Sequence, residues 1–167
     1  MRLLELPSYC SQKLELALSG QDAEIAKIVK SLKAAGWLVR SAREISANLS
    51  TYKTYVTGSR GEFSVAKNAY VKTRSGWFSD RSVCYLAAGR PVILQDTGFS
   101  DWLPTGRGVL AFSSLESAID GMERVNIDYL THCLAAREIA EQIFSYKVVL
   151  PRLLETVQEE LGRVEVG

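Results

Sequence analysis

The sequence predicts an α/β fold, in which a mostly parallel sheet lies between two layers of helices. Strand-like and helix-like segments alternate along the chain, and that order favours parallel strands joined by helical crossovers. The segment "PVILQ" (residues 91–95) is a continuous apolar run, which is typical of a parallel strand covered on both faces. The 167 residues suffice for one such domain. We therefore expect a single Rossmann-like, three-layer αβα domain over residues 1–167.

The first part of the chain is expected to be a helical lead-in over residues 1–36. Apolar residues recur at helical spacing from Ile25 to Leu32, and Gly36 is placed to end that helix. The short apolar segment "WLVRS" (37–41) then predicts the first strand. It opens a sheet core that we expect to span residues 37–112.

The middle of the chain is expected to add a helix and a strand to this core. The segment "SANLSTYKTYV" (46–56) predicts a short helix, with Ser46 or Asn48 as its cap. The β-branched alternation of "EFSVA" (62–66) predicts a strand, and a long loop is expected over residues 67–78.

A helix and two strands are expected to complete the core. Ser79 or Asp80 can cap a helix that runs to Ala88. Residues 91–95 then form a buried strand, and "GVLAF" (108–112) forms the next one. The helix is expected to turn Val83, Leu86 and Ala87 inward.

The last third, residues 113–167, is expected to consist of closing helices. Ser113 or Ser114, followed by Glu116 or Ser117, has the pattern of a helix start. Residues 115–144 are expected to be helical nearly throughout, and residues 145–164 form a final helix with Pro151 near its start.

Composition argues against several classes of function. The 20 basic and 19 acidic residues nearly cancel, which argues against a protein that binds nucleic acid. No apolar run approaches the roughly 20 residues of a membrane span. The first residues lack the pattern of a signal peptide, so a cytoplasmic location is expected.

The cysteines and the single histidine point to no catalytic or metal site. Cys10, Cys84 and Cys133 are far apart and odd in number, so neither a disulfide framework nor a metal site is expected. His132 lies within a predicted helix, where a surface or half-buried position is expected. No catalytic triad can be assembled around it.

The loops at one edge of the sheet are where a ligand is expected. In open α/β sheets, ligands lie beyond the carboxyl ends of the strands. Here that edge is formed by residues 41–46, 67–79, 96–106 and 113–114.

The segment from Ser75 to Phe112 resembles the carboxyl-terminal, donor-binding domain of GT-B glycosyltransferases. It has a glycine-aromatic loop, "SGWF", a helix ending in "LAAG", the strand entry "RPVI", a glycine-bearing loop and the strand entry "GRG". The resemblance implies that a nucleotide-diphosphate sugar binds as the donor substrate, with no further cofactor and no metal.

The resemblance also implies which residues hold the donor. The diphosphate would lie at the helix start near Ser79 and Asp80, because unpaired amides and the helix dipole favour anions. Candidate cations are Arg60, Lys67 and Arg81, although Arg60 lies at the wrong end of its strand. Arg81 lies in the first turn of the predicted helix, where the helix dipole makes a cation unfavourable. A bound anion is therefore expected to compensate its charge. The donor-binding candidates are Lys67, Arg81, Arg60, Asp80, Ser79, Trp77, Gly76, Thr97 and Gly98.

Several of these candidates and their neighbours also have a structural interpretation. Arg60 and Lys67 are suited to be solvated surface cations. Trp77, Phe78 and Trp102 are suited either to stack on a base or sugar or to plug the sheet edge. Asp80 is suited to cap the helix. Asp96 and Asp101 flank a glycine turn, where turn chemistry alone accounts for them.

The chain departs from the family pattern in two respects. Trp77 and Cys84 stand where retaining members have two glutamates, so contacts to the sugar are altered or lost. Two β–α units and the acceptor half are also missing, so the domain is expected to be incomplete. The alternatives to a glycosyltransferase are an inactive nucleotide-binding module and a protein-interaction domain with the same fold. A homodimer or a partner acceptor domain is expected to cover the exposed sheet edge.

Overall fold

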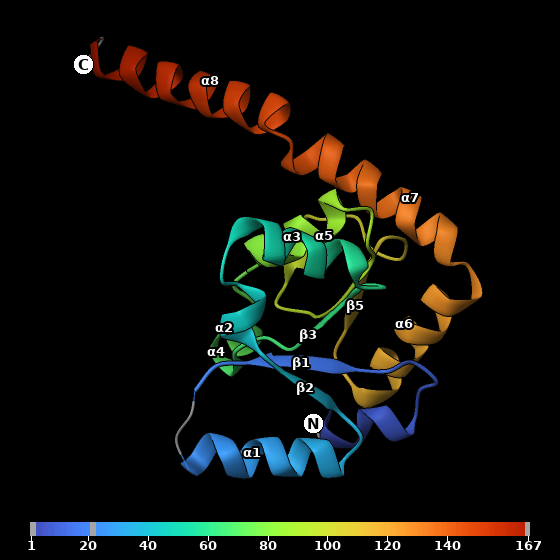
Figure 1. Ribbon diagram of the computed structural model, residues 1–167. Coiled ribbons are helices and arrows are strands. Elements are labelled where there is room, and N and C mark those ends of the chain that lie inside the picture. Colours follow the sequence, from blue (N-terminus) through green and yellow to red (C-terminus); the bar gives the residue numbers. More distant parts are fainter. Residues whose placement is uncertain (1–2, 21–22, 166–167) are drawn as a thin grey trace.

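The structure is a computed structural model that describes residues 3–20 and 23–165, and it has an α/β architecture (Figure 1). Strands β1 (Glu15–Leu18) and β2 (Leu38–Ser41) form one parallel pair. Strands β3 (Glu62–Ser64), β4 (Val92–Gln95) and β5 (Val109–Phe112) form a separate parallel sheet, with β4 in the middle. The expected single sheet is therefore divided in two within the described residues.

Strand β1 corrects the expected helical lead-in. Residues 15–18 form a strand, and helix α1 begins only at Ala23 and ends at Ala34. The leucines at 14, 16 and 18 recur every second residue, which is the period of a strand. A short 3-10 helix, η1 (Leu3–Ser8), precedes β1.

The first sheet leads into two short helices, α2 (Ala42–Ile45) and α3 (Leu49–Gly58). Asn48 caps α3, because its side-chain oxygen accepts a hydrogen bond from the Thr51 amide at 2.9 Å. This confirms one of the two caps expected for that helix.

The loop expected over residues 67–78 contains a helix, α4 (Asn68–Thr73). Lys67 occupies its N-cap position and makes no side-chain cap hydrogen bond, and Arg74 ends it in the left-handed conformation at φ 47°. The helix therefore lacks the usual capping residues that sequence reasoning depends on.

Helix α5 (Asp80–Ala87) is capped by Ser79, as expected. Its buried residues are Ser82, Tyr85 and Leu86, whereas Val83 is half-buried and Ala87 is exposed. The inward face is therefore rotated from the one that the sequence predicted, and it is more polar.

The three-stranded sheet is covered on both faces. Val92 and Leu94 pack with Leu86 of α5 on one face. Ile93, between them in β4, packs on the opposite face with Met122 of helix α6 (Leu115–Ile127). This alternation of side chains along β4 makes the three layers.

The carboxyl-terminal segment begins with α6 (Leu115–Ile127), where Ser114 and Ser117 form a capping box. Helix α7 (Tyr129–Ile139) follows a break at Asp128 and continues into a π-helical segment, η3 (Ala140–Phe144). Helix α8 (Tyr146–Glu165) then projects away from the body of the molecule (Figure 1). No helix within the described residues is long and apolar enough to cross a membrane.

Pro151 lies in the second turn of α8, with Tyr146 as the first residue of that helix. Proline therefore does not occupy the first helical position, where its missing N–H would be without consequence. Instead it removes one hydrogen bond from the helix interior.

His132 is buried, which corrects the expected surface or half-buried position. Its Nδ1 accepts a hydrogen bond from the Gly108 amide at 3.2 Å, at the entry to β5. A Cβ added to Gly108 would lie 2.5 Å from the Ala136 backbone nitrogen. Glycine is therefore required where β5 meets α7.

Candidate functional site

The loop edge lies beyond the carboxyl ends of β3 and β4, and it consists of residues 66–67, 74–79 and 96–102. The backbone amide of Ala66 donates to the Gln95 side-chain oxygen at 3.1 Å, which holds the exits of the two strands together. Most of the residues that the sequence predicted for a ligand site therefore lie at one edge, as expected for a parallel sheet.

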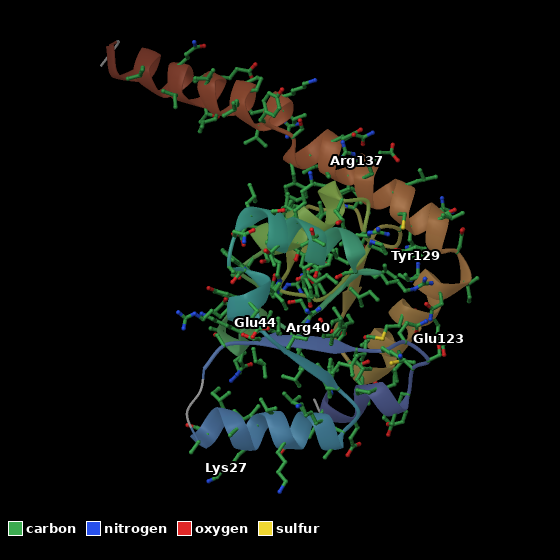
Figure 2. All side chains as sticks on the ribbon, viewed as in Figure 1. Lys27, Arg40, Glu44, Glu123, Tyr129 and Arg137 are labelled. Atoms are coloured by element: carbon green, nitrogen blue, oxygen red, sulfur yellow. The ribbon has the colours of Figure 1, made fainter. Side chains whose placement is uncertain are left out.

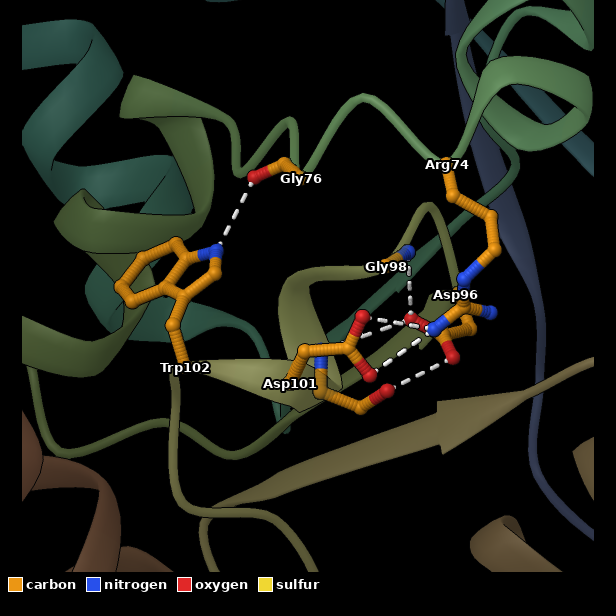
Figure 3. A network of polar contacts seen from close by, with 7 residues as sticks. Arg74, Gly76, Asp96, Gly98, Asp101 and Trp102 are labelled. Carbon is orange, nitrogen blue, oxygen red and sulfur yellow. Dashed lines mark hydrogen bonds and ion pairs between the residues drawn. The ribbon is translucent and has the colours of Figure 1, made fainter.

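Two segments of the loop edge are tied by hydrogen bonds (Figure 3). The Gly76 amide donates to the Thr97 carbonyl at 2.9 Å, and the Thr97 hydroxyl donates to the Trp77 carbonyl at 2.6 Å. The Trp102 indole N–H donates to the Gly76 carbonyl at 3.2 Å. Thr97 is buried and acts here as a link between the two segments.

The segment 96–102 is also fixed by a carboxylate. Asp96 accepts hydrogen bonds from the Gly98 amide at 2.9 Å and from the Ser100 hydroxyl at 2.7 Å. Gly98 has φ 94°, and a Cβ there would lie 3.0 Å from the Arg74 carbonyl oxygen. Gly98 is therefore needed for the turn, as the turn interpretation of Asp96 predicted.

Arg74 and Asp101 form an exposed ion pair across the loop edge, with a nitrogen–oxygen distance of 2.7 Å (Figure 3). Sequence reasoning named Asp101 only as a turn residue and did not name Arg74. The two residues are 27 positions apart in the sequence, so only the folded arrangement brings the pair together.

The aromatic residues of the loop edge divide into a plug and an exposed pair. Phe78 stacks on Phe144 at 5.3 Å and meets Phe99 edge-on at 5.5 Å, so it plugs the sheet edge. Trp77 and Trp102 are each 49% exposed. Trp77 stacks on Tyr70 of α4, with ring centroids 5.3 Å apart.

Lys67 is an exposed cation of the loop edge. It stands at the N-cap position of α4, one turn before Tyr70. Among the hydrogen bonds and ion pairs found in residues 3–20 and 23–165, none involves its side chain. Its charge therefore remains available at the start of α4, one turn before Tyr70, which stacks on Trp77.

The start of α5 is partly occupied by its own side chains. The Arg81 amide donates to the Asp80 carboxylate at 2.9 Å and to the Ser79 hydroxyl at 3.3 Å. Ser79 is therefore the cap, and Asp80 is the first residue of the helix, with its carboxylate bonded to the same amide. Its negative charge opposes a phosphate at the same position.

Arg81 is not the unpaired cation that the sequence predicted. Its Nε donates to Glu62 Oε1 at 2.7 Å, and its Nη2 donates to the Ser64 hydroxyl at 2.8 Å. The Glu62 side chain is only 5% exposed, whereas that of Arg81 is 52% exposed. The arginine thus compensates a buried carboxylate at the start of β3, and the expected conflict with the helix dipole is offset by this pair.

Arg60 lies away from the loop edge, at the amino end of β3. Its guanidinium carbon is 4.0 Å from the ring centroid of Tyr129, and its Nη2 donates to Asn126 at 3.3 Å. The Tyr129 hydroxyl donates to the Arg60 carbonyl at 2.7 Å. Arg60 is therefore engaged in contacts with Tyr129 and Asn126 at the end of β3 opposite the loop edge.

Cys84 is exposed on α5, one turn beyond Arg81. Neither Cys84 nor Trp77, the two positions aligned with the family's glutamates, carries a carboxylate. Within the described residues there is also no group of three acidic, histidine or cysteine side chains that could hold a metal ion.

A second region, the sheet cavity, lies between the β1–β2 pair and β3 and has a volume of about 1300 Å³. Its wall includes Glu62, Ser64, Arg81 and Tyr85, while none of the loop-edge residues lines it. Burial raises the pKa of the nearby Tyr52 hydroxyl to about 12. Sequence reasoning did not predict this cavity, because it exists only where the two sheets fail to join.

Comparison with protein-family models, with curated proteins and with solved structures found no match to this chain.

Proposed function

We propose that this chain is a Rossmann-like, glycosyltransferase-like domain that binds a nucleotide-diphosphate sugar at the loop edge. The observation that carries the proposal is the group formed by Lys67, Tyr70 and Trp77. Lys67 is an exposed cation one helical turn before Tyr70, and Tyr70 stacks on Trp77, which is about half exposed. Nucleotides offer the two complementary features, an anionic diphosphate and a flat ring.

The loop edge supports this function through its rigidity. The hydrogen bonds between segments 74–79 and 96–102 fix the backbone carrying Trp77 and Trp102. A fixed aromatic surface loses little conformational entropy when a base or sugar stacks on it. Many ligands combine an anionic group with a flat ring. We choose a nucleotide sugar among them because the segment "SGWFSDRSVCYLAAGRPVI" resembles the donor-binding domain of GT-B glycosyltransferases.

The diphosphate is assigned to Lys67 rather than to the start of α5. The amide of Arg81 is already bonded to the Asp80 carboxylate, and the Arg81 side chain is bonded to Glu62. Of the three candidate cations, Lys67 is therefore the one that lies at the loop edge and makes no side-chain hydrogen bond or ion pair within the described residues, whereas Arg81 lines the sheet cavity. Catalysis would follow by electrostatic stabilisation of the leaving diphosphate, in a cleft completed by an acceptor-binding partner.

Calorimetry with a panel of nucleoside diphosphates tests the proposal. Lys67→Ala is expected to weaken binding about tenfold, since a charge-assisted hydrogen bond contributes about 1.5–3 kcal/mol. Asp80→Asn is expected to strengthen it, because a negative charge leaves the site. Lys27→Ala is the matched control, since Lys27 is an exposed lysine on α1, which is not part of the loop edge (Figure 2).

Two results would overturn this assignment. One is the absence of heat with every nucleoside diphosphate in the panel. The other is an equal loss of affinity in Lys67→Ala and Lys27→Ala, which would indicate a general effect of net charge rather than a contact.

A protein-interaction domain is the second candidate, and the exposed apolar face of α8 favours it. Large apolar side chains recur along this helix at helical spacing, and each is between 45% and 68% exposed. They are Tyr146, Val149, Leu150, Leu153, Leu154, Val157 and Leu161. Light scattering at micromolar concentration distinguishes the candidates, because a homodimer is expected if this face mediates self-association and a monomer contradicts that.

A further inference from the structure

Glu62 has an acceptor oxygen that the described residues do not satisfy. Its Oε1 accepts from Arg81, whereas its Oε2 is buried and has no hydrogen-bond partner. Buried carboxylate oxygens normally accept at least one hydrogen bond, because leaving one without a donor costs free energy. Glu62 also lines the sheet cavity. A ligand hydroxyl in that cavity would provide the missing donor.

Arg81 adds unused donors at the same place. A guanidinium carries five N–H groups, and only one on Nε and one on Nη2 are assigned to Glu62 and Ser64. The side chain is about half exposed and lines the cavity beside Glu62. It can therefore hold an anion while it keeps its bond to the carboxylate.

The Glu62 carboxylate can accept from a ligand hydroxyl, and the Arg81 guanidinium can donate to a ligand anion. Other residues of the cavity wall add cations and hydroxyl groups to these two. Arg40 and Lys13 line the same cavity and are exposed. The wall also carries the hydroxyl groups of Ser50, Thr51, Thr54, Ser59 and Ser64. These groups favour a ligand that is both hydroxylated and negatively charged.

We infer that the sheet cavity is a second binding site, for a phosphorylated polyol such as a sugar phosphate. A hydroxyl of the ligand donates to Glu62 Oε2, and its phosphate accepts from Arg81 and from the rim cations Arg40 and Lys13. The cavity volume of about 1300 Å³ accommodates such a molecule with space for water. This site does not depend on the nucleotide proposed for the loop edge, whose residues lie outside the cavity wall.

Calorimetry with glucose 1-phosphate, inorganic phosphate and glucose as separate probes tests the inference. Glucose 1-phosphate is expected to bind at least tenfold more tightly than either inorganic phosphate or glucose, since it alone engages both Glu62 and Arg81. Glu62→Gln is expected to weaken its binding at least tenfold. Glu123→Gln is the matched control, because Glu123 is exposed on α6 and outside the cavity wall (Figure 2).

A variant at the rim keeps the test decisive if Glu62→Gln fails to fold, as judged by circular dichroism. Arg40→Gln alters an exposed side chain, and it is expected to weaken glucose 1-phosphate binding at least threefold. Equal binding of inorganic phosphate and glucose 1-phosphate would overturn the inference, as would full affinity in both the Glu62 and the Arg40 variants.

The same measurements separate this site from the loop edge. Lys67→Ala is expected to leave glucose 1-phosphate binding unchanged. If Lys67→Ala abolished that binding while Glu62→Gln did not, the probe would be bound at the loop edge and the cavity assignment would be wrong. A nucleoside diphosphate that fails to bind, together with glucose 1-phosphate that binds through Glu62, would reject the proposed function and support the inference.

Discussion

Replacing Arg81 with alanine should destabilise the fold, because it removes the charged partner of a buried carboxylate. The Glu62 side chain is 5% exposed, so its charge is poorly solvated once the guanidinium is absent. Breaking a buried ion pair costs about 3–5 kcal/mol, and one charge-assisted hydrogen bond contributes about 1.5–3 kcal/mol. Because Arg81 is 52% exposed and water already screens this pair, we expect a loss of about 2 kcal/mol in unfolding free energy.

The assay is urea unfolding followed by circular dichroism, on wild type, Arg81→Ala, Glu62→Gln and the double variant. In a thermal melt of the same variants, a loss of about 2 kcal/mol corresponds to a fall of about 4–8 °C in Tm for a chain of this size. The double variant should be more stable than the sum of the single changes predicts, because it leaves no buried charge without a partner.

Arg74→Ala is the matched control for this cycle. Its ion pair with Asp101 has the same 2.7 Å distance, but both side chains are more than half exposed. Solvent screening should therefore leave its urea midpoint unchanged. Equal stability of Arg81→Ala and wild type, or strict additivity in the double variant, would refute the role assigned to the pair.

Two further predictions concern the contact between β5 and α7, at His132 and Gly108. Burial lowers the pKa of His132 in the folded state. The histidine of the unfolded chain therefore binds a proton at a higher pH than that of the folded chain, and stability should fall as the pH falls below about 6.5. The urea midpoint is measured at pH 7.5 and at pH 5.5. His132→Asn keeps an acceptor near the Gly108 amide, and it should reduce the difference between the two midpoints relative to wild type. An unchanged difference would exclude His132 as its source. Gly108→Ala should cost about 2 kcal/mol or more in urea unfolding, because the new Cβ meets the α7 backbone at a positive φ of 74°. Gly58→Ala, where nothing lies within 4 Å, is its control, and similar losses in both would contradict the steric explanation.

Local signals were enough to predict much of the three-stranded sheet and its helices. The apolar run before Gln95 predicted β4, and Ser79 and Asn48 predicted the starts of α5 and α3, because caps and apolar runs act within a few residues. The rule that loops gather at the carboxyl ends of parallel strands also placed Lys67 and Trp77 at one edge.

The features that sequence reasoning missed depend on contacts between distant segments. Glu62 and Arg81 are 19 residues apart, and they meet only because β3 pairs with β4 while α5 packs over that sheet. Strand β1 was mistaken for a helix, since four residues of leucine alternation are too short to establish a period. The two sheets are separate because the β1–β2 pair makes no strand pairing with β3, β4 or β5. Composition and residue spacing do not show which strands pair.

The division of the strands into two sheets has a consequence for how the molecule opens. The β1–β2 pair meets the larger sheet through side chains, such as Trp37 against Phe63 with ring centroids 6.4 Å apart. The backbone amides of β4, in contrast, lie in a strand that is paired on both sides. Hydrogen exchange at β1 and β2 can therefore proceed by a partial opening that leaves β4 protected. We therefore expect two cooperative units of unequal stability. The less stable one forms one wall of the sheet cavity, so a ligand bound there should slow exchange at β1 and β2 first.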